Sequence, residues 1–310
     1  MLNPGPLNIG LYTITVLIWG STWYAITFQL GTVAVEVSLF YRFGLAAVIL
    51  LAFCLATKRS LKFSARDHAT IAAQGFFLFS INYFFFYIAQ TYLTSALVAI
   101  GFSTIVFYNV VLGAMFFKTR VCARVVIGGL IGLFGLGLVF RPELKTFDLA
   151  DGAMTGLGIT LFATLLASLG NMASVKNQKK GISVIAANAL GMTYGAVFLL
   201  ILIALRGTPF TYEATAGYTL SLLYLAVFGS VIAFGSYLSL LGRIGADRAA
   251  YATVLFPVVA LALSSVFENY QWTGVALLGF AFVLAGNVLA LGRRWTRTKA
   301  PAAEAAPRLP

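Results

Sequence analysis

The sequence predicts an all-α integral membrane protein in which ten transmembrane helices form two inverted five-helix repeats. Composition is the first observation: of 310 residues, 60% are hydrophobic and 10% are charged, whereas soluble domains contain about 25% charged residues. The mean hydropathy is +0.93. Apolar runs of roughly 20 residues, long enough to cross a bilayer, recur along the chain. These observations exclude a soluble enzyme, a disordered chain and a nucleic-acid-binding domain.

Ten apolar segments account for nearly the whole chain. The bilayer core offers no water to backbone amides and carbonyls, so each segment is expected to be a helix. The alternating pattern of a membrane β-barrel is absent. A stretch rich in Ala and Pro, 292–310, is expected to be a disordered cytoplasmic tail. The ten segments run approximately over 9–28, 35–57, 70–90, 94–117, 122–140, 152–175, 182–205, 217–241, 247–267 and 271–291.

The basic residues predict the orientation of the chain in the membrane. Four connections and the C-terminal tail, all on one side of the predicted bundle, contain 17 of the 21 Lys and Arg residues. The connections on the other side contain only Arg141, Lys145 and Arg206. Positive charge marks the cytoplasmic side of a membrane. We therefore expect a multi-pass protein of the cell inner (plasma) membrane with both termini in the cytoplasm, and no nucleic-acid partner despite the net charge of +12.

The chain offers little for enzymatic or metal chemistry. His68 is the only histidine, so a two-histidine metal site within one chain is excluded. Cys54 and Cys122 have neither metal nor redox spacing, and nucleotide-binding and hydrolase signatures are absent. We expect a protein that is not an enzyme and that has no catalytic residues, no cofactor and no metal.

The ten segments divide into two sets of five. Residues 84–140 and 236–291 share an order of features: a helix with Tyr and Ser, a short link, an apolar helix, a polar break and a glycine-rich helix. An odd number of crossings makes the second set enter the membrane from the opposite side, as in many secondary transporters, whose substrate site lies between the halves. The expected repeats are 9–140 and 152–291. Apolar helices also resemble one another without any repeat, and that alternative stays open here.

Short motifs add a family resemblance. Residues 19–25, WGSTWYA, resemble the WGS signature that opens the EamA branch of the drug/metabolite transporter superfamily, and residues 41–43, YRF, resemble its second helix. Pro257, Glu268 and Gly274 follow a pattern like the closing motif of that family. The resemblance covers nearly the whole chain. Within the superfamily, the chain is most similar to the YddG-type exporters of aromatic and other amino acids.

The resemblance implies a ten-helix exporter of small metabolites, most of all aromatic and other neutral amino acids, that works by alternating access. Lys118 and Ile105 depart from the pattern, because they stand where the first repeat would carry an acid and a proline. The alternatives are an exporter of drugs, nucleotide sugars or organic phosphates, or a lipid scramblase. The expected partners are a small-molecule substrate and the lipid bilayer. We expect a monomer, and GxxxG spacings leave a dimer open.

The acidic residues bear on energy coupling. All nine Asp and Glu residues lie in connections, tails or segment ends, and none lies at the centre of a segment. A proton-coupled antiporter usually needs a buried carboxylate within the membrane. We therefore expect export without an intramembrane proton carrier.

Candidate substrate-binding residues are polar and aromatic side chains inside the predicted spans. In the third segment, Ser80, Tyr83, Tyr87 and Gln90 recur at i, i+3, i+7 and i+10, which is one helical face, and Asn82 lies beside them. Such a stripe suits a cavity for a partly apolar solute. It equally suits an aromatic belt or hydrogen bonds between helices. Facing segments contribute the remaining candidates of this kind, Trp19, Asn171 and Tyr237.

Arg42 is the strongly ionised side chain that lies well inside a segment. Inserting it costs roughly 2.5–3.5 kcal/mol on insertion scales, so it should face a partner or a wet cavity. It could receive a substrate carboxylate, and we count it among the substrate-binding candidates. It could equally snorkel to the surface or neutralise Glu36 or Glu268.

Overall fold

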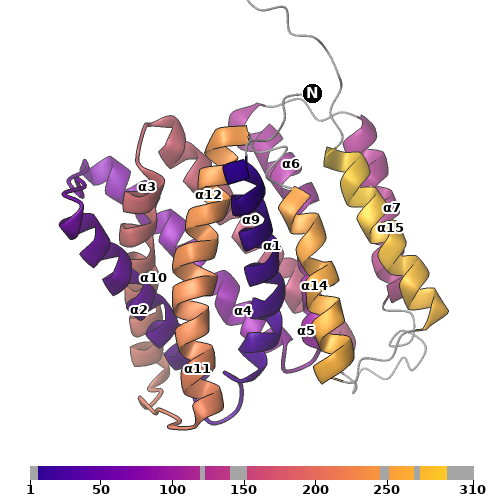
Figure 1. Ribbon diagram of the computed structural model, residues 1–310, viewed down its shortest axis with the longest axis horizontal. Helices are drawn as coiled ribbons and strands as arrows, with labels where there is room; N and C mark the ends of the chain where they lie inside the picture. The colour runs from indigo at the N-terminus through magenta and orange to yellow at the C-terminus, as the bar shows by residue number, and fades with distance from the viewer. Residues whose placement is uncertain (1–5, 119–122, 140–151, 245–250, 269–272, 292–310) are drawn as a thin grey trace, which may run out of the picture.

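A computed structural model describes residues 6–118, 123–139, 152–244, 251–268 and 273–291, and these residues form helices and short connections without any strand (Figure 1). The expected tail and Cys122 lie outside the described residues. Within these ranges, seven helices are long and apolar enough to span a membrane, and three shorter apolar helices accompany them. The protein is therefore an all-helical, multi-pass membrane protein, as the sequence predicts.

The described residues of the first half form five helical stretches, and two of them are interrupted. The third stretch changes to a π-helix at its centre, and the fourth breaks at Ser103 and Thr104, whose hydroxyls donate to the carbonyls of Ile100 and Gly101 and so compete with the helical ladder. The elements are α1 (Pro6–Thr27), α2 (Val35–Ala56), α3 (Ala65–Phe76), η1 (Phe77–Ile81), α4 (Asn82–Ala89), α5 (Ser95–Phe102), α6 (Ile105–Phe117) and α7 (Ala123–Val139).

The second half has a similar order of elements. Its third stretch again contains a π-helical segment, and α14 contains Pro257. A proline removes one backbone hydrogen bond and disturbs a helix at that point. The elements are α9 (Ala153–Lys179), α10 (Val184–Arg206), α11 (Ala216–Tyr224), η3 (Leu225–Ile232), α12 (Ala233–Ile244), α14 (Tyr251–Phe267) and α15 (Gly274–Leu291).

Glycines bring α7 and α15 together at one edge of the bundle, where Figure 1 shows the two helices side by side. A Cβ atom on Gly135 would stand 2.5 Å from the carbonyl oxygen of Gly279, and one on Gly286 would stand 2.5 Å from that of Gly128. Only glycine permits such close backbone approach. The GxxxG spacing that begins at Gly128 is thus used for packing within the chain.

The remaining helices pack largely across the two halves of the sequence. Helix α2 packs against α10, α1 against α14 and α12, and α9 against α4, α5 and α6. Large apolar side chains cover the outside of the bundle: Leu55, Met115 and Leu205 are 72%, 70% and 81% exposed. A surface of this kind suits contact with lipid rather than water.

Candidate functional site

A cavity lies between the two halves of the chain, at the centre of the bundle. Its volume is about 50 Å³, which gives room for roughly three to five water molecules. Its walls come from α1, η1, α4, α5, α6, α9, α12 and α14. The lining residues are Trp19, Thr22, Trp23, Ile26, Leu78, Asn82, Tyr83, Phe86, Phe102, Ile105, Ala167, Asn171, Phe234, Tyr237 and Phe256.

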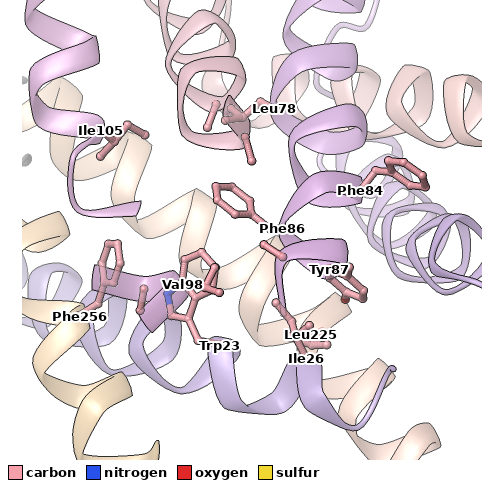
Figure 2. Packing of buried hydrophobic residues seen from close by; sticks show 14 of the residues in the cluster. Trp23, Ile26, Leu78, Phe84, Phe86, Tyr87, Val98, Ile105, Leu225 and Phe256 are labelled. Carbon is pink, nitrogen blue, oxygen red and sulfur yellow. The ribbon is translucent and has the colours of Figure 1, made fainter. Parts of the chain in front are cut away.

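One wall of the cavity is an aromatic cluster from four separate helices, α1, α4, α5 and α14. Figure 2 shows Trp23, Phe86 and Phe256, which come from α1, α4 and α14 and turn toward one another. The ring centroids of Trp23 and Phe86 are 5.3 Å apart, and those of Trp23 and Phe102 are 5.4 Å apart. These are edge-to-face and tilted contacts, a favourable geometry for aromatic pairs.

A second aromatic group surrounds Trp19. The indole N–H of Trp19 donates to the carbonyl oxygen of Gly229 at 3.3 Å, which fixes the ring against η3. Its ring lies 5.0 Å from that of Phe234 and 4.9 Å from that of Tyr237, both on α12. The cavity therefore has flat, apolar faces on both sides.

Polar groups enter the cavity from α4 and α9. Asn82 is only 2% exposed, and its buried side-chain oxygen has no hydrogen-bond partner. A buried unpaired acceptor costs free energy unless a ligand or water meets it. On the other side, the Asn171 amide and the Ser168 hydroxyl both donate to the Asn109 side chain, at 3.3 and 2.7 Å. Asn82 thus keeps a free acceptor, whereas Ser168 links two helices.

Five of the eight candidates from the sequence line the cavity: Trp19, Asn82, Tyr83, Asn171 and Tyr237. Ser80, Tyr87 and Arg42 do not. The cavity-facing positions of the third stretch are Leu78, Asn82 and Phe86, spaced by four, with Tyr83 beside them. Of the expected stripe, Tyr83 lines the cavity, whereas Ser80, inside η1, and Tyr87, whose hydroxyl accepts from Arg42, do not.

Arg42 lies directly behind this lining and is 1% exposed. Its Nε–H donates to the Ser230 hydroxyl at 3.1 Å, and an Nη1–H donates to the Tyr87 hydroxyl at 3.3 Å. The guanidinium carbon stands 4.6 Å from the ring centroid of Tyr83 and 5.1 Å from that of Phe43. Arg42 therefore does not snorkel to the surface.

Neither acid that could have neutralised Arg42 does so. Glu36 accepts a hydrogen bond from Thr208 at 2.7 Å and pairs with Nε of Arg206 at 3.3 Å. Glu268 accepts from the backbone N–H and the hydroxyl of Ser95. Among the described residues, the contacts of the Arg42 guanidinium are hydroxyl groups and aromatic rings.

Sequence reasoning missed most of the apolar lining. Trp23, Phe86, Phe102, Phe234 and Phe256 carry no signal that separates them from other apolar residues in apolar helices, because nearly every position of such helices is hydrophobic. Thr22 shares a helical face with Trp19, and that spacing is a usable signal.

A multi-pass helical protein with a mixed aromatic and polar cavity between its halves has the architecture of a membrane transporter. The EamA-like transporter family model matches residues 8–141 and 154–292. The chain belongs to this family, whose members are transporters and not enzymes.

Known relatives are similar over most of their length. A protein of Escherichia coli (strain K12) named "Probable amino-acid metabolite efflux pump" is 25% identical over 297 residues, which cover 93% of this chain and 96% of that protein. An "Uncharacterized transporter" of Clostridium kluyveri is 23% identical over 252 residues, 80% of each chain. One solved crystal structure is similar with a TM-score of 0.67 and 17% identity, covering 90% of this chain and 94% of that chain. That likeness concerns the fold alone.

Proposed function

We propose that the protein is a secondary transporter of the inner membrane that exports small metabolites, most of all aromatic and other neutral amino acids. The observation that carries this proposal is the central cavity, which residues from both halves of the chain line with aromatic faces and a few polar groups. Binding sites for small, partly apolar molecules have this composition. The name of the Escherichia coli relative is consistent with amino acids as substrates.

We also propose that residues 9–140 and 152–291 are two five-helix repeats of inverted topology. The packing supports this reading, because contacts between a helix of one half and a helix of the other come in pairs in which the two halves change places. The first helix of one half, α1, packs on α14, and its counterpart α9 packs on α5 and α6. Likewise α2 packs on η3, as α10 packs on η1. With α7, α14 and α15 counted as spans, the chain crosses the membrane ten times and both termini lie in the cytoplasm.

Alternating access follows from such an arrangement. Two halves that pack around one cavity can rock about it and open it first to one side and then to the other. The π segments η1 and η3 lie in the third stretch of each half, and such segments are often found at functional sites. The segment η1 ends directly before Asn82, and η3 contains Gly229.

The lining also favours export without an intramembrane proton carrier. None of the residues that line the cavity in the described part of the chain is a carboxylate. Glu36 and Glu268 are engaged at helix ends by Arg206 and Ser95. We therefore propose that a neutral or zwitterionic solute moves down its own gradient.

The experiment is counterflow in liposomes that contain the purified protein. Vesicles preloaded with unlabelled phenylalanine, methionine or threonine are diluted into the labelled amino acid, with and without a pH gradient. We expect labelled phenylalanine or methionine to accumulate transiently and to the same extent under both conditions. Flux that follows the pH gradient would contradict the uncoupled mechanism. An absence of amino-acid flux through folded protein would overturn the substrate class in favour of drugs, phosphates or lipid.

A further inference from the structure

We propose that Arg42 is the carboxylate-binding residue of the central cavity, and that a good substrate must carry a free carboxylate. The inference rests on the proposed function and names the substrate class of that site. It follows from the charge of Arg42, from its unfilled hydrogen-bonding capacity and from the thin wall that separates it from the cavity.

Among the residues that the structure describes, no carboxylate pairs with Arg42. The guanidinium is 1% exposed, and the two ion pairs of the described residues involve Lys180 with Asp67 and Arg206 with Glu36. A buried cation inside a membrane is costly and marks a functional site by default. An anionic ligand would supply the missing counter-charge.

The hydrogen-bonding capacity of Arg42 is only partly used. A guanidinium has five N–H donors in a planar fork that matches a carboxylate. The structure gives acceptors to Nε and to one Nη1 hydrogen, namely the hydroxyls of Ser230 and Tyr87. The Ser230 hydroxyl in turn donates to the carbonyl oxygen of Leu225 at 3.0 Å. These contacts hold the side chain in place and leave donors for a ligand.

Two residues separate Arg42 from the cavity, Tyr83 and Gly229. Tyr83 lines the cavity, and its ring centroid lies 4.6 Å from the guanidinium carbon. Gly229 packs between Thr22, which lines the cavity, and Arg42: a Cβ atom on Gly229 would stand 2.9 Å from the methyl carbon of Thr22 and 3.4 Å from Nη2 of Arg42, so this position has no room for a side chain. The guanidinium is therefore one ring and one glycine away from the lining, and rotation of the Tyr83 ring would expose it to a ligand in the cavity.

The same region offers a hydrogen-bond acceptor to the ammonium group of an amino acid. Asn82 precedes Tyr83, lines the cavity and has a buried side-chain oxygen without a partner. An ammonium group can donate to that oxygen while the carboxylate meets Arg42. The aromatic faces around Trp19 and Trp23 then receive the substrate side chain. Two fixed polar points and an apolar pocket select zwitterionic amino acids over amines of the same shape.

The first test uses ligands and leaves the protein unchanged. Binding of phenylalanine, phenylalaninamide and phenethylamine to the purified protein in detergent is measured by calorimetry and by the shift of the unfolding temperature. We expect the amide and the amine to bind about tenfold or more weakly than phenylalanine, since hydrogen bonds to charged groups are the strong ones. Equal binding of the three compounds, or no binding of any, would overturn the proposal.

The second test uses variants. Arg42→Gln should bring the affinities for phenylalanine and phenylalaninamide to within about twofold of each other, whereas Arg42→Lys should keep part of the difference. Gly229→Ala should weaken phenylalanine binding more than amide binding, because the added methyl group would press on Nη2 of Arg42 and shift the guanidinium. Arg59→Gln, at an exposed position away from the cavity, is the matched control and should bind like the wild type.

Failure of this inference can be told apart from failure of the proposed function. Counterflow of phenylalanine that persists in Arg42→Gln with unchanged preference over the amide would keep the transport function and overturn the role of Arg42. If Arg42→Gln does not fold, Gly229→Ala and the ligand comparison decide. Discrimination against the amide in binding, without any counterflow by the wild type, would support the carboxylate site and contradict transport.

Discussion

Glu268, directly after α14, caps the N-terminus of α5: its carboxylate accepts hydrogen bonds from the backbone N–H of Ser95, at 3.1 Å, and from the Ser95 hydroxyl. The first N–H groups of a helix have no partner within the helix, and negative charge is favourable there. Here the acid comes from the other half of the chain, so the contact joins the halves at one end of the bundle.

This contact gives a prediction about stability. Replacing Glu268 by Gln should lower the free energy of unfolding by about 1 kcal/mol, as expected for a lost charged cap. Thermal unfolding of purified protein in detergent measures the change. In a double-mutant cycle with Ser95→Ala, the two substitutions should be non-additive. Additive effects would show that the residues act independently.

A second prediction concerns Asn82. Asn82→Ala removes the unpaired side-chain oxygen from the cavity, and we expect kcat/KM for amino-acid counterflow to fall about tenfold, as for the loss of one hydrogen bond to a charged group. Thr193→Ala is the control, because the Thr193 hydroxyl donates within its own helix to the carbonyl of Ala189 at 2.8 Å. Wild-type kinetics in Asn82→Ala, with normal insertion, would remove Asn82 from the substrate site.

A third prediction concerns the glycine contact between α7 and α15. Gly279→Val should destabilise the protein by about 1–3 kcal/mol or more, since the side chain would meet the backbone of α7. Gly137→Val is the matched control, because a Cβ atom there has no neighbour within 4 Å. The unfolding temperature and the yield of monodisperse protein are the measurements. Equal behaviour of the two variants would mean that the helices can separate without loss.

A fourth prediction concerns a buried chain of amides that joins α3, α9 and α10. The Asn177 amide donates to the Gln74 oxygen at 2.9 Å, and the Gln74 amide donates to the Asn188 oxygen at 3.1 Å. Gln74→Leu leaves both asparagines without that partner and should cost about 1–3 kcal/mol of stability. Replacing all three residues by apolar ones should restore part of it. A neutral single variant would show that water takes the place of Gln74.

Most of the fold could be predicted because lipid imposes a simple rule. Each apolar segment of about 20 residues must be a helix, since helices and closed barrels alone satisfy the backbone in hydrocarbon and the alternating pattern of a barrel is absent. The predicted segment 35–57 is thus Val35–Ala56, and 182–205 is Val184–Arg206. Trp19 and Tyr237 could be predicted as cavity residues because a polar group inside a membrane span is costly unless it meets a partner or a cavity.

The rest of the site depends on tertiary contacts that the pattern does not contain. Phe102 and Phe256 look like any core residue until α5 and α14 are placed on α1. The partners of Arg42 were equally open: Glu36 lies on the same helix, yet Arg206 and Thr208 engage it. A charge inside a span indicates that a partner exists but does not identify it.

The π-helical segment η1 has a consequence for how this helix can change. A π turn holds one residue more than the α-helical turn that it replaces, so the stretch before Phe77 and the stretch after Ile81 are rotated relative to each other by an angle that a regular helix would not have. The face that α3 presents to α10 and the face that α4 presents to the cavity are therefore set separately. Substitutions could remodel the solute specificity around Asn82 while the contact of α3 with its neighbour in the membrane stays as it is.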